Sequence, residues 1–261
     1  MHLTKLLMIA ALAATPAARA GESDWQELLP GVTARVISAD AVDAGGRMLV
    51  GLELDLPPGH KTYWRVPGET GLPPQFDLSG SRGIAGHQPV WPMPQVDETA
   101  GYLDFVYTGR VVLPIEVSLE DSESGDLALD MFVGICSDIC VPAQARFDLT
   151  LADEPDRANG LRLRQAVATA PLAGSGLVEA ARVEAGELVL TLEPGAARPD
   201  SLIVACADGE AVFGAARHVP RTGEVRIPLM GRPNVSGTHR LEILYATPQG
   251  PLFEQVEVRL D

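Results

Sequence analysis

The chain has 261 residues, of which 46% are hydrophobic and 21% charged, and its formal net charge is −15. This balance is typical of a globular protein and excludes a largely disordered one. An acidic surface repels nucleic-acid phosphates and anionic lipids, so we expect no nucleic-acid partner and at most peripheral contact with a membrane. Three cysteines are too few for a scaffold held together by disulfides.

Residues 1–20 have the pattern of a cleaved signal peptide. Lys5 precedes the apolar run 6–14, and residues 18–20 (Ala-Arg-Ala) form the small-x-small pattern that a signal peptidase cleaves. The mature chain should begin near Gly21 with a net charge of −17, because the signal holds one lysine, one arginine and no acidic residue. No later apolar stretch reaches the about 20 residues that cross a bilayer. We therefore expect a secreted, periplasmic protein.

Apolar residues alternate with polar ones through most of the mature chain, which predicts half-buried β-strands. Clusters of Gly, Pro, Asp and Asn separate the alternating segments at short intervals, as in antiparallel β-sandwiches. The alternation covers residues 50–56, 111–119, 127–133, 147–151, 188–192, 241–245 and 256–260.

One short helix is expected near residues 160–170, after a polar stretch that is typical of a domain boundary. Residues 60–104 are rich in Pro and Gly, and we expect a long irregular region there that is functional or wraps the core, with Trp64 and Trp91 fixing it to the sandwich. The predicted division is a signal peptide at 1–20, a first β domain at 21–155, a linker with the helix at 156–171 and a second β domain at 172–261.

The most informative motif is the pair Cys136 and Cys140 between two alternating segments. Four extended residues span about 13 Å, whereas bonded cysteines have Cα atoms about 4.4–6.8 Å apart, so a disulfide requires the chain to reverse. Ser137 and Asp138 favour such a turn, which predicts a hairpin. Odd-numbered residues such as Ile135 belong to the apolar face, so both cysteines should point outward, away from the core.

Three roles for the pair remain open. A bond that closes so small a ring removes little unfolded-chain entropy, which makes a purely structural staple less attractive than thiol–disulfide exchange. Pro142 lacks an amide donor and favours an edge strand, where a partner protein has access. The alternative is a Cu(I) site that uses both thiolates, with Met93 or Met131 nearby. A zinc site would need two more ligands, and no His or Cys lies close in sequence.

The other candidate ligands are scattered along the chain. His60, His87, His218 and His239 are each expected to be surface or loop residues. Cys206 follows an apolar run and is expected to be a buried, small hydrophobic residue of a strand.

Four motifs follow one another along the first predicted domain: residues 61–74 (KTYWRVPGETGLPP), 91–94 (WPMP), 107–114 (YTGRVVLP) and 136–142 (CSDICVP). In this order they resemble the periplasmic N-terminal region of DsbD-like and ScsB-like protein-disulfide reductases. Residues 61–74 resemble the family signature TYWRNPGDSGLPP, and residues 136–142 are similar to its CKEICVP. The resemblance covers most of the first predicted domain.

This resemblance implies an immunoglobulin-like domain in which Cys136 and Cys140 are the catalytic residues and no further cofactor is needed. The pair would take reducing equivalents from a membrane thiol-electron transporter or a thioredoxin-like domain and pass them to periplasmic thiol proteins. It also implies a loop that shields the pair, which we expect at residues 95–102. Asp97, Glu98 and Tyr102 are the candidates there for proton handling and shielding. The expected fold is all-β, with two immunoglobulin-like antiparallel β-sandwich domains joined by a short helix.

Two features differ from the full-length DsbD form. The sequence stops at Asp261 without a multi-helix membrane portion or a thioredoxin-like C-x-x-C, so we expect the electron donor to be a separate chain. The short cysteine spacing resembles the ScsB-like branch, which is often linked to copper tolerance. We expect a reduced partner to attack Cys140 and to release Cys136 as the leaving thiolate. Asp138 should raise the pKa of both thiols and slow the free dithiol.

Overall fold

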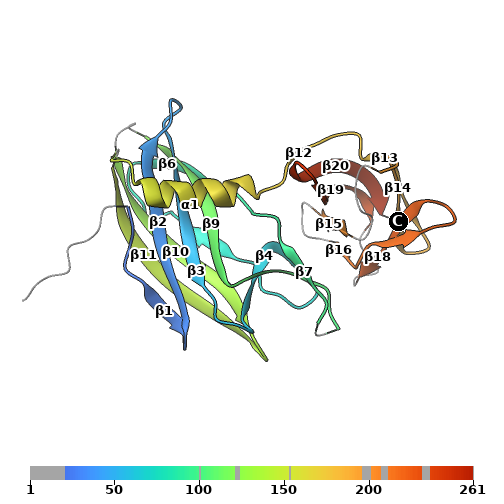
Figure 1. Cartoon of the computed structure of the whole chain (residues 1–261), viewed down its shortest axis with the longest axis horizontal. Helices are drawn as coiled ribbons and strands as arrows, with labels where there is room; N and C mark the ends of the chain where they lie inside the picture. The colour runs from blue at the N-terminus through green and yellow to red at the C-terminus, as the bar shows by residue number, and fades with distance from the viewer. Residues whose placement is uncertain are drawn as a thin grey trace, which may run out of the picture.

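The computed structural model describes residues 21–99, 101–120, 124–152, 154–195, 201–206, 211–230 and 236–260. The predicted signal peptide lies outside these residues. Figure 1 shows two β units side by side, with one helix that runs along the first unit and leads to the second. The predicted all-β class is confirmed. Among the described residues, no helix is long and apolar enough to span a membrane.

The first unit contains two antiparallel sheets that face each other across one core. The five-stranded sheet has the order β1 (Gln26–Leu29), β2 (Val32–Val42), β3 (Arg47–Asp55), β9 (Arg110–Leu119) and β6 (Ile84–Pro89). The six-stranded sheet has the order β11 (Cys140–Ala152), β10 (Ser124–Cys136), β4 (Lys61–Gly68), β8 (Asp104–Thr108) and β7 (Gln95–Asp97), and β5 (Gln75–Asp77) also pairs with β10. Strand β11 is thus an edge strand, as Pro142 predicted.

The apolar alternation of the sequence becomes the core between these sheets. On β3, Val50, Leu52 and Leu54 are fully buried, and Leu113 and Ile115 of β9 meet them in the same layer. Because each strand presents every second side chain to one face, this pattern fixes which face of the sheet points inward.

Helix α1 (Arg157–Ala168) covers the outer face of the five-stranded sheet. It begins at Arg157, three residues before the predicted start. Asp156 caps it, because its carboxylate accepts hydrogen bonds from the backbone N–H groups of residues 158 and 159. Leu163 packs on Ile37 and Ala39 of β2. Gly51 makes this close approach possible, since a Cβ there would lie 2.7 Å from Leu163 Cδ2.

The second unit has two further sheets. One has the order β12 (Leu172–Ala173), β20 (Gly250–Leu260), β19 (Gly237–Thr247) and β15 (Ile203–Cys206). The other has the order β13 (Val178–Glu184), β14 (Glu187–Leu192), β18 (Glu224–Met230) and β16 (Val212–Phe213), with β17 (Arg217–Val219) also on β18. The prediction of purely antiparallel sheets is wrong at one point, because β12 joins β20 in parallel.

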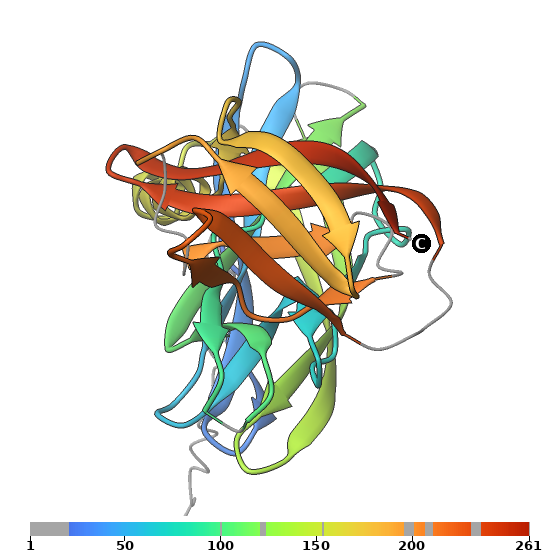
Figure 2. The ribbon, with the colours of Figure 1, turned by 90° about the vertical axis from the view of Figure 1, so that its right-hand side faces the viewer.

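The sheet that contains β15 and β19 has apolar residues on both faces. Val204 and Ile243 point into the core of the second unit, whereas Ile203, Ala205 and Leu244 belong to the core of the first. A strand buried on both faces reads as a continuous apolar run, and this explains why all four residues of β15 are buried. The view turned by 90° shows this part of the second unit in front of the first (Figure 2).

The prediction that residues 60–104 form one long irregular region is wrong. The segment contains β4, β5, β6 and β7, which are short and belong to two different sheets. The backbone at Gly68 has φ 93°, and a Cβ there would lie 2.2 Å from the Leu103 carbonyl oxygen, so only glycine fits. Trp64 is buried edge-to-face against Phe105, and Trp91 stacks on Phe76.

Substitution of Gly51 tests the contact between the helix and the sheet. We expect Gly51→Ala to lower the free energy of unfolding by about 1–3 kcal/mol, because the added methyl overlaps Leu163 and approaches the Leu113 carbonyl oxygen at 3.1 Å. Gly86→Ala is the matched control, since a Cβ there meets nothing within 4 Å. Urea unfolding measures both variants, and equal midpoints would contradict the described contact.

Candidate functional site

The hairpin of β10 and β11 brings the two cysteines together. Cys136 is the last residue of β10 and Cys140 the first of β11, and the two are partners in the strand register. Their sulfur atoms form a disulfide, with Cα atoms 4.0 Å apart. Ser137, Asp138 and Ile139 form the turn, closed by a hydrogen bond from the Ser137 N–H to the Ile139 carbonyl at 3.2 Å. The chain therefore reverses between the cysteines, as the spacing required.

The two sulfur-bearing residues differ sharply in exposure. Cys140 is exposed and its neighbour Ile139 is 71% exposed, whereas Cys136 is 1% exposed. Cys136 points away from the main core, as predicted, but it is nevertheless buried. Its side chain packs in a small cluster apart from the main core, with Tyr63 and Val106 of the neighbouring strands. Strand parity identified the correct face, but it could not show that this face is covered.

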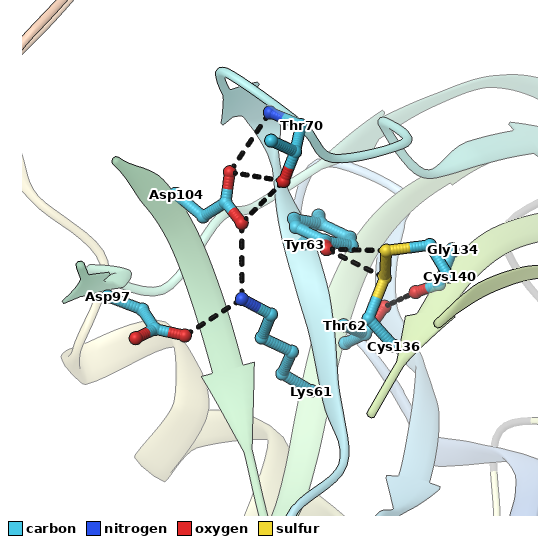
Figure 3. The surroundings of a disulfide bond; sticks show 9 residues. All are labelled: Lys61, Thr62, Tyr63, Thr70, Asp97, Asp104, Gly134, Cys136 and Cys140. Carbon is cyan, nitrogen blue, oxygen red and sulfur yellow. Dashed lines mark hydrogen bonds and ion pairs between the residues drawn. A yellow bond between two sulfur atoms is a disulfide. The ribbon is translucent and has the colours of Figure 1, made fainter. Parts of the chain in front are cut away.

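Tyr63 of β4 is the residue that covers the sulfurs (Figure 3). Its hydroxyl lies 2.7 Å from Cys136 Sγ and 3.2 Å from Cys140 Sγ. The Thr62 hydroxyl donates to the Gly134 carbonyl at 2.8 Å and holds β4 beside β10. Burial, and then the negative charge of Asp104, raise the pKa of Tyr63. The phenol therefore keeps its proton at neutral pH and remains a hydrogen-bond donor.

The segment after β4 lies over Tyr63 and completes the cover. A Cβ on Gly71 would lie 2.3 Å from Tyr63 Cδ1, and a Cβ on Gly134 would lie 2.8 Å from Leu72 Cβ. Only hydrogen fits at either position. Neither Tyr63 nor Gly71 was among the predicted site residues, although both lie in the 61–74 motif. That motif was the sequence signal that could have identified them.

Beside the sulfurs, Lys61 connects two carboxylates across the sheet (Figure 3). Its ammonium lies 2.8 Å from Asp97 and 3.1 Å from Asp104. Asp104 also accepts hydrogen bonds from Thr70, on the segment that covers Tyr63. Burial alone would lower the pKa of Lys61, but hydrogen bonds to the two carboxylates raise it.

Of the three candidates in residues 95–102, Asp97 pairs with Lys61 beside the sulfurs (Figure 3). The hydrogen bond to Lys61, followed by those from Thr99, lowers the pKa of Asp97 to about 2, so this carboxylate is a fixed anion at neutral pH. Glu98 is exposed and Tyr102 is 53% exposed. The hydrogen bonds that reach the sulfurs come from Tyr63. The residues that cover Cys136 are therefore Tyr63 and the segment at 70–72, whereas Cys140 stays exposed.

The two methionines considered for a copper site both pack with the main core. Met131 packs in the main core, on the opposite face of β10 from Cys136. Met93 packs against the same core, and its N–H donates to the Thr169 carbonyl beyond the end of α1. Across the ranges that the structure describes, no three His, Cys, Asp or Glu residues gather as metal ligands.

In the second unit, Cys206 is buried in β15, as expected from its apolar run. His239 is also buried, 4.0 Å from the Cys206 sulfur, so its prediction as a surface or loop residue is wrong. His239 lies in β19 two residues before Leu241 and four before Ile243. Alternate side chains of a strand share a face, so His239 points to the same side as these two core residues. His87 and His218 are exposed, as expected.

Comparisons with known proteins agree with this geometry. Residues 26–152, which include both bonded cysteines, match the family described as "Thiol:disulfide interchange protein DsbD, N-terminal". A crystal structure of the N-terminal periplasmic domain of ScsB from Proteus mirabilis superposes with a TM-score of 0.70 at 19% identity. The match covers 92% of this chain and 99% of that one, so the shared fold includes both units. No curated protein matches the chain.

The ion pair of Asp97 predicts a particular loss of stability in acid. A carboxylate whose pKa falls from 3.8 to about 2 on folding stabilises the native state above pH 3.8, and this contribution disappears as the pH falls toward 2. We expect a loss on the order of 1–2 kcal/mol over that interval, after allowance for partial exposure. Asp97→Asn should remove this part of the pH dependence in urea unfolding.

Glu98→Gln, an exposed neighbour, is the control for the same measurement. An Asp97→Asn variant whose stability still falls between pH 4 and 2 as the parent's does would show that the ion pair with Lys61 contributes nothing.

Proposed function

Residues 26–152 belong to the family of DsbD N-terminal domains, and from this we propose that the chain is a periplasmic thiol–disulfide exchange protein. Its Cys136–Cys140 pair would relay reducing equivalents to exported proteins that carry disulfides. The single observation that supports this most directly is the contrast between an exposed sulfur residue, Cys140, and its buried partner, Cys136.

This contrast favours one direction of attack. A visiting thiolate reaches Cys140, and the S–S bond breaks as its electron pair moves to Cys136. The product is a mixed disulfide between the partner and Cys140. A second thiolate of the partner then attacks the partner's own sulfur in that bond and releases Cys140 as a thiolate. The partner ends as a disulfide, and the pair ends as a dithiol after it takes up two protons.

Tyr63 supplies what the leaving sulfur needs. Its hydroxyl is already 2.7 Å from Cys136 Sγ, in the position where negative charge develops when the bond breaks. A hydrogen bond to a thiolate is stronger than one to a neutral disulfide sulfur, so the contact stabilises the transition state more than the ground state. The raised pKa of Tyr63 keeps the donor protonated.

The reverse sequence would reduce a client. The Cys140 thiolate attacks the client disulfide, and Cys136 then resolves the mixed disulfide. We propose a membrane thiol-electron transporter or a thioredoxin-like domain on a separate chain as the donor. Family membership and the periplasmic origin of the similar ScsB domain support this assignment.

Single serine substitutions should distinguish the reactivity of Cys140 from that of Cys136. We expect Cys136→Ser to form a lasting mixed disulfide with a thioredoxin-fold protein that keeps a single active-site cysteine, supplied as its disulfide with thionitrobenzoate. The exposed Cys140 thiolate attacks the partner sulfur and releases thionitrobenzoate, and no second thiol remains on either chain to resolve the new bond. Cys140→Ser should form at least tenfold less adduct, since Cys136 is covered by Tyr63. Non-reducing mass spectrometry after equal incubation measures both adducts.

The midpoint potential of the wild-type pair is the companion measurement. A relay requires a potential above about −300 mV, whereas a pair that stays oxidised well below that value is an inert structural bond. The latter result would overturn the proposed function, as would equal adduct yields from the two serine variants.

Removal of the Tyr63 hydroxyl should slow the exchange. A hydrogen bond has a net value of about 0.5–1.5 kcal/mol, which corresponds to a reaction about 2- to 10-fold slower. We expect Tyr63→Phe to show this decrease in the rate of reduction by dithiothreitol. Tyr102→Phe, at an exposed ring of the same unit, should leave the rate unchanged. A Tyr63→Phe variant as fast as the wild type would contradict the role of the hydroxyl.

A further inference from the structure

We propose that the second unit takes part in the exchange reaction, through Glu242 as a positioning residue that holds strand β4 and its Tyr63 against the sulfur pair. This inference rests on the proposed function. It assigns a role to a carboxylate of β19 that touches neither sulfur.

Strand β4 links the site to the second unit within three residues. Tyr63 contacts both sulfurs, Trp64 enters the core of the first unit, and Arg65 forms an ion pair with Glu242. A displacement of Arg65 is therefore transmitted to Tyr63 over two peptide units.

The backbone ladder does not hold this part of β4. Pairing with β10 ends at Lys61 and Thr62, and pairing with β8 breaks after Tyr63 and resumes only at Gly68. Between these points Trp64 and Arg65 have no register partner on β8, so their side-chain contacts contribute more to the position of the strand. The position of the Tyr63 hydroxyl thus depends on contacts that Trp64 and Arg65 make elsewhere.

Those contacts converge on Glu242. The Arg65 guanidinium lies 4.5 Å from the centre of the Trp64 ring, a cation–π contact, while it pairs with the Glu242 carboxylate. Gln255 of β20 donates a hydrogen bond to the other carboxylate oxygen at 3.4 Å. The Arg65 and Glu242 side chains are 27% and 18% exposed, so solvent screens the pair only in part.

Apolar packing alone does not fill the joint. Leu244 and Phe253 of the second unit meet the first unit here, yet an open cleft of about 450 Å³ remains between them and Trp64, Arg65 and Trp91. Because apolar packing is incomplete here, the ion pair between Arg65 and Glu242 is the contact that fixes the position of the Arg65 guanidinium.

The test compares rates of reduction by dithiothreitol in the full chain. We expect Glu242→Gln to react about 2- to 10-fold more slowly than the wild type, as Tyr63→Phe does. The double variant Tyr63→Phe/Glu242→Gln should be no slower than Tyr63→Phe alone, because both changes remove the same hydrogen bond. Exchange of the charges, in Arg65→Glu/Glu242→Arg, should restore at least half of the lost rate.

Glu257→Gln is the matched control, since Glu257 lies on the neighbouring strand in an exposed pair with Arg240 at 3.9 Å. Urea unfolding checks that all variants are folded under the conditions of the rate measurement. A Glu242→Gln rate equal to that of Glu257→Gln would overturn the inference. Additive effects in the double variant would also overturn it, since Glu242 would then act by another route. A wild-type pair that is not reduced at all would instead refute the proposed function.

Discussion

The hydrogen bonds from the Tyr63 hydroxyl to the two sulfurs are the contacts on which the site depends. They require β4 to lie beside the end of the hairpin, a ring-sized space beneath Gly71 and a protonated phenol. The hairpin itself only brings the sulfurs within bonding distance. The phenol on one side of the bond makes the two sulfurs unequal, and this inequality gives an otherwise symmetrical chemical group a direction.

Two further groups of polar contacts hold β4 in place around the Tyr63 hydroxyl. Lys61 and its two carboxylates connect β4 with β7 and with the covering segment, and the pair of Arg65 and Glu242 connects β4 with the second unit. A single strand therefore receives constraints from three directions. The main core lies beneath this strand and is the rigid, close-packed surface on which it rests.

The sequence was sufficient for the features that follow from local pattern. Alternation predicted the strands of the core, and the spacing of Cys136 and Cys140 predicted the hairpin. It was insufficient where a neighbouring strand decides the outcome, as in the burial of Cys136 under Tyr63. The strands between residues 60 and 104 were missed because β5 and β7 have three residues each, and because β4 has no apolar alternation, since Thr62, Tyr63 and Trp64 are all buried. His239 was wrongly predicted to be exposed for the same reason as Cys136, because the burial of a polar residue depends on its partners across the sheet.

The absence of a side chain at Gly71 has a consequence for related chains. Any larger residue there would push the aromatic ring away and leave the reduced dithiol open to small disulfides and other oxidants of the medium. Such a chain would lose its electrons to whichever oxidant diffused past, and its reducing power would be dissipated before a client arrived. The lack of a side chain at Gly71 thus lets Tyr63 stay over Cys136, and under the proposed function this protects the dithiol from oxidation between partners.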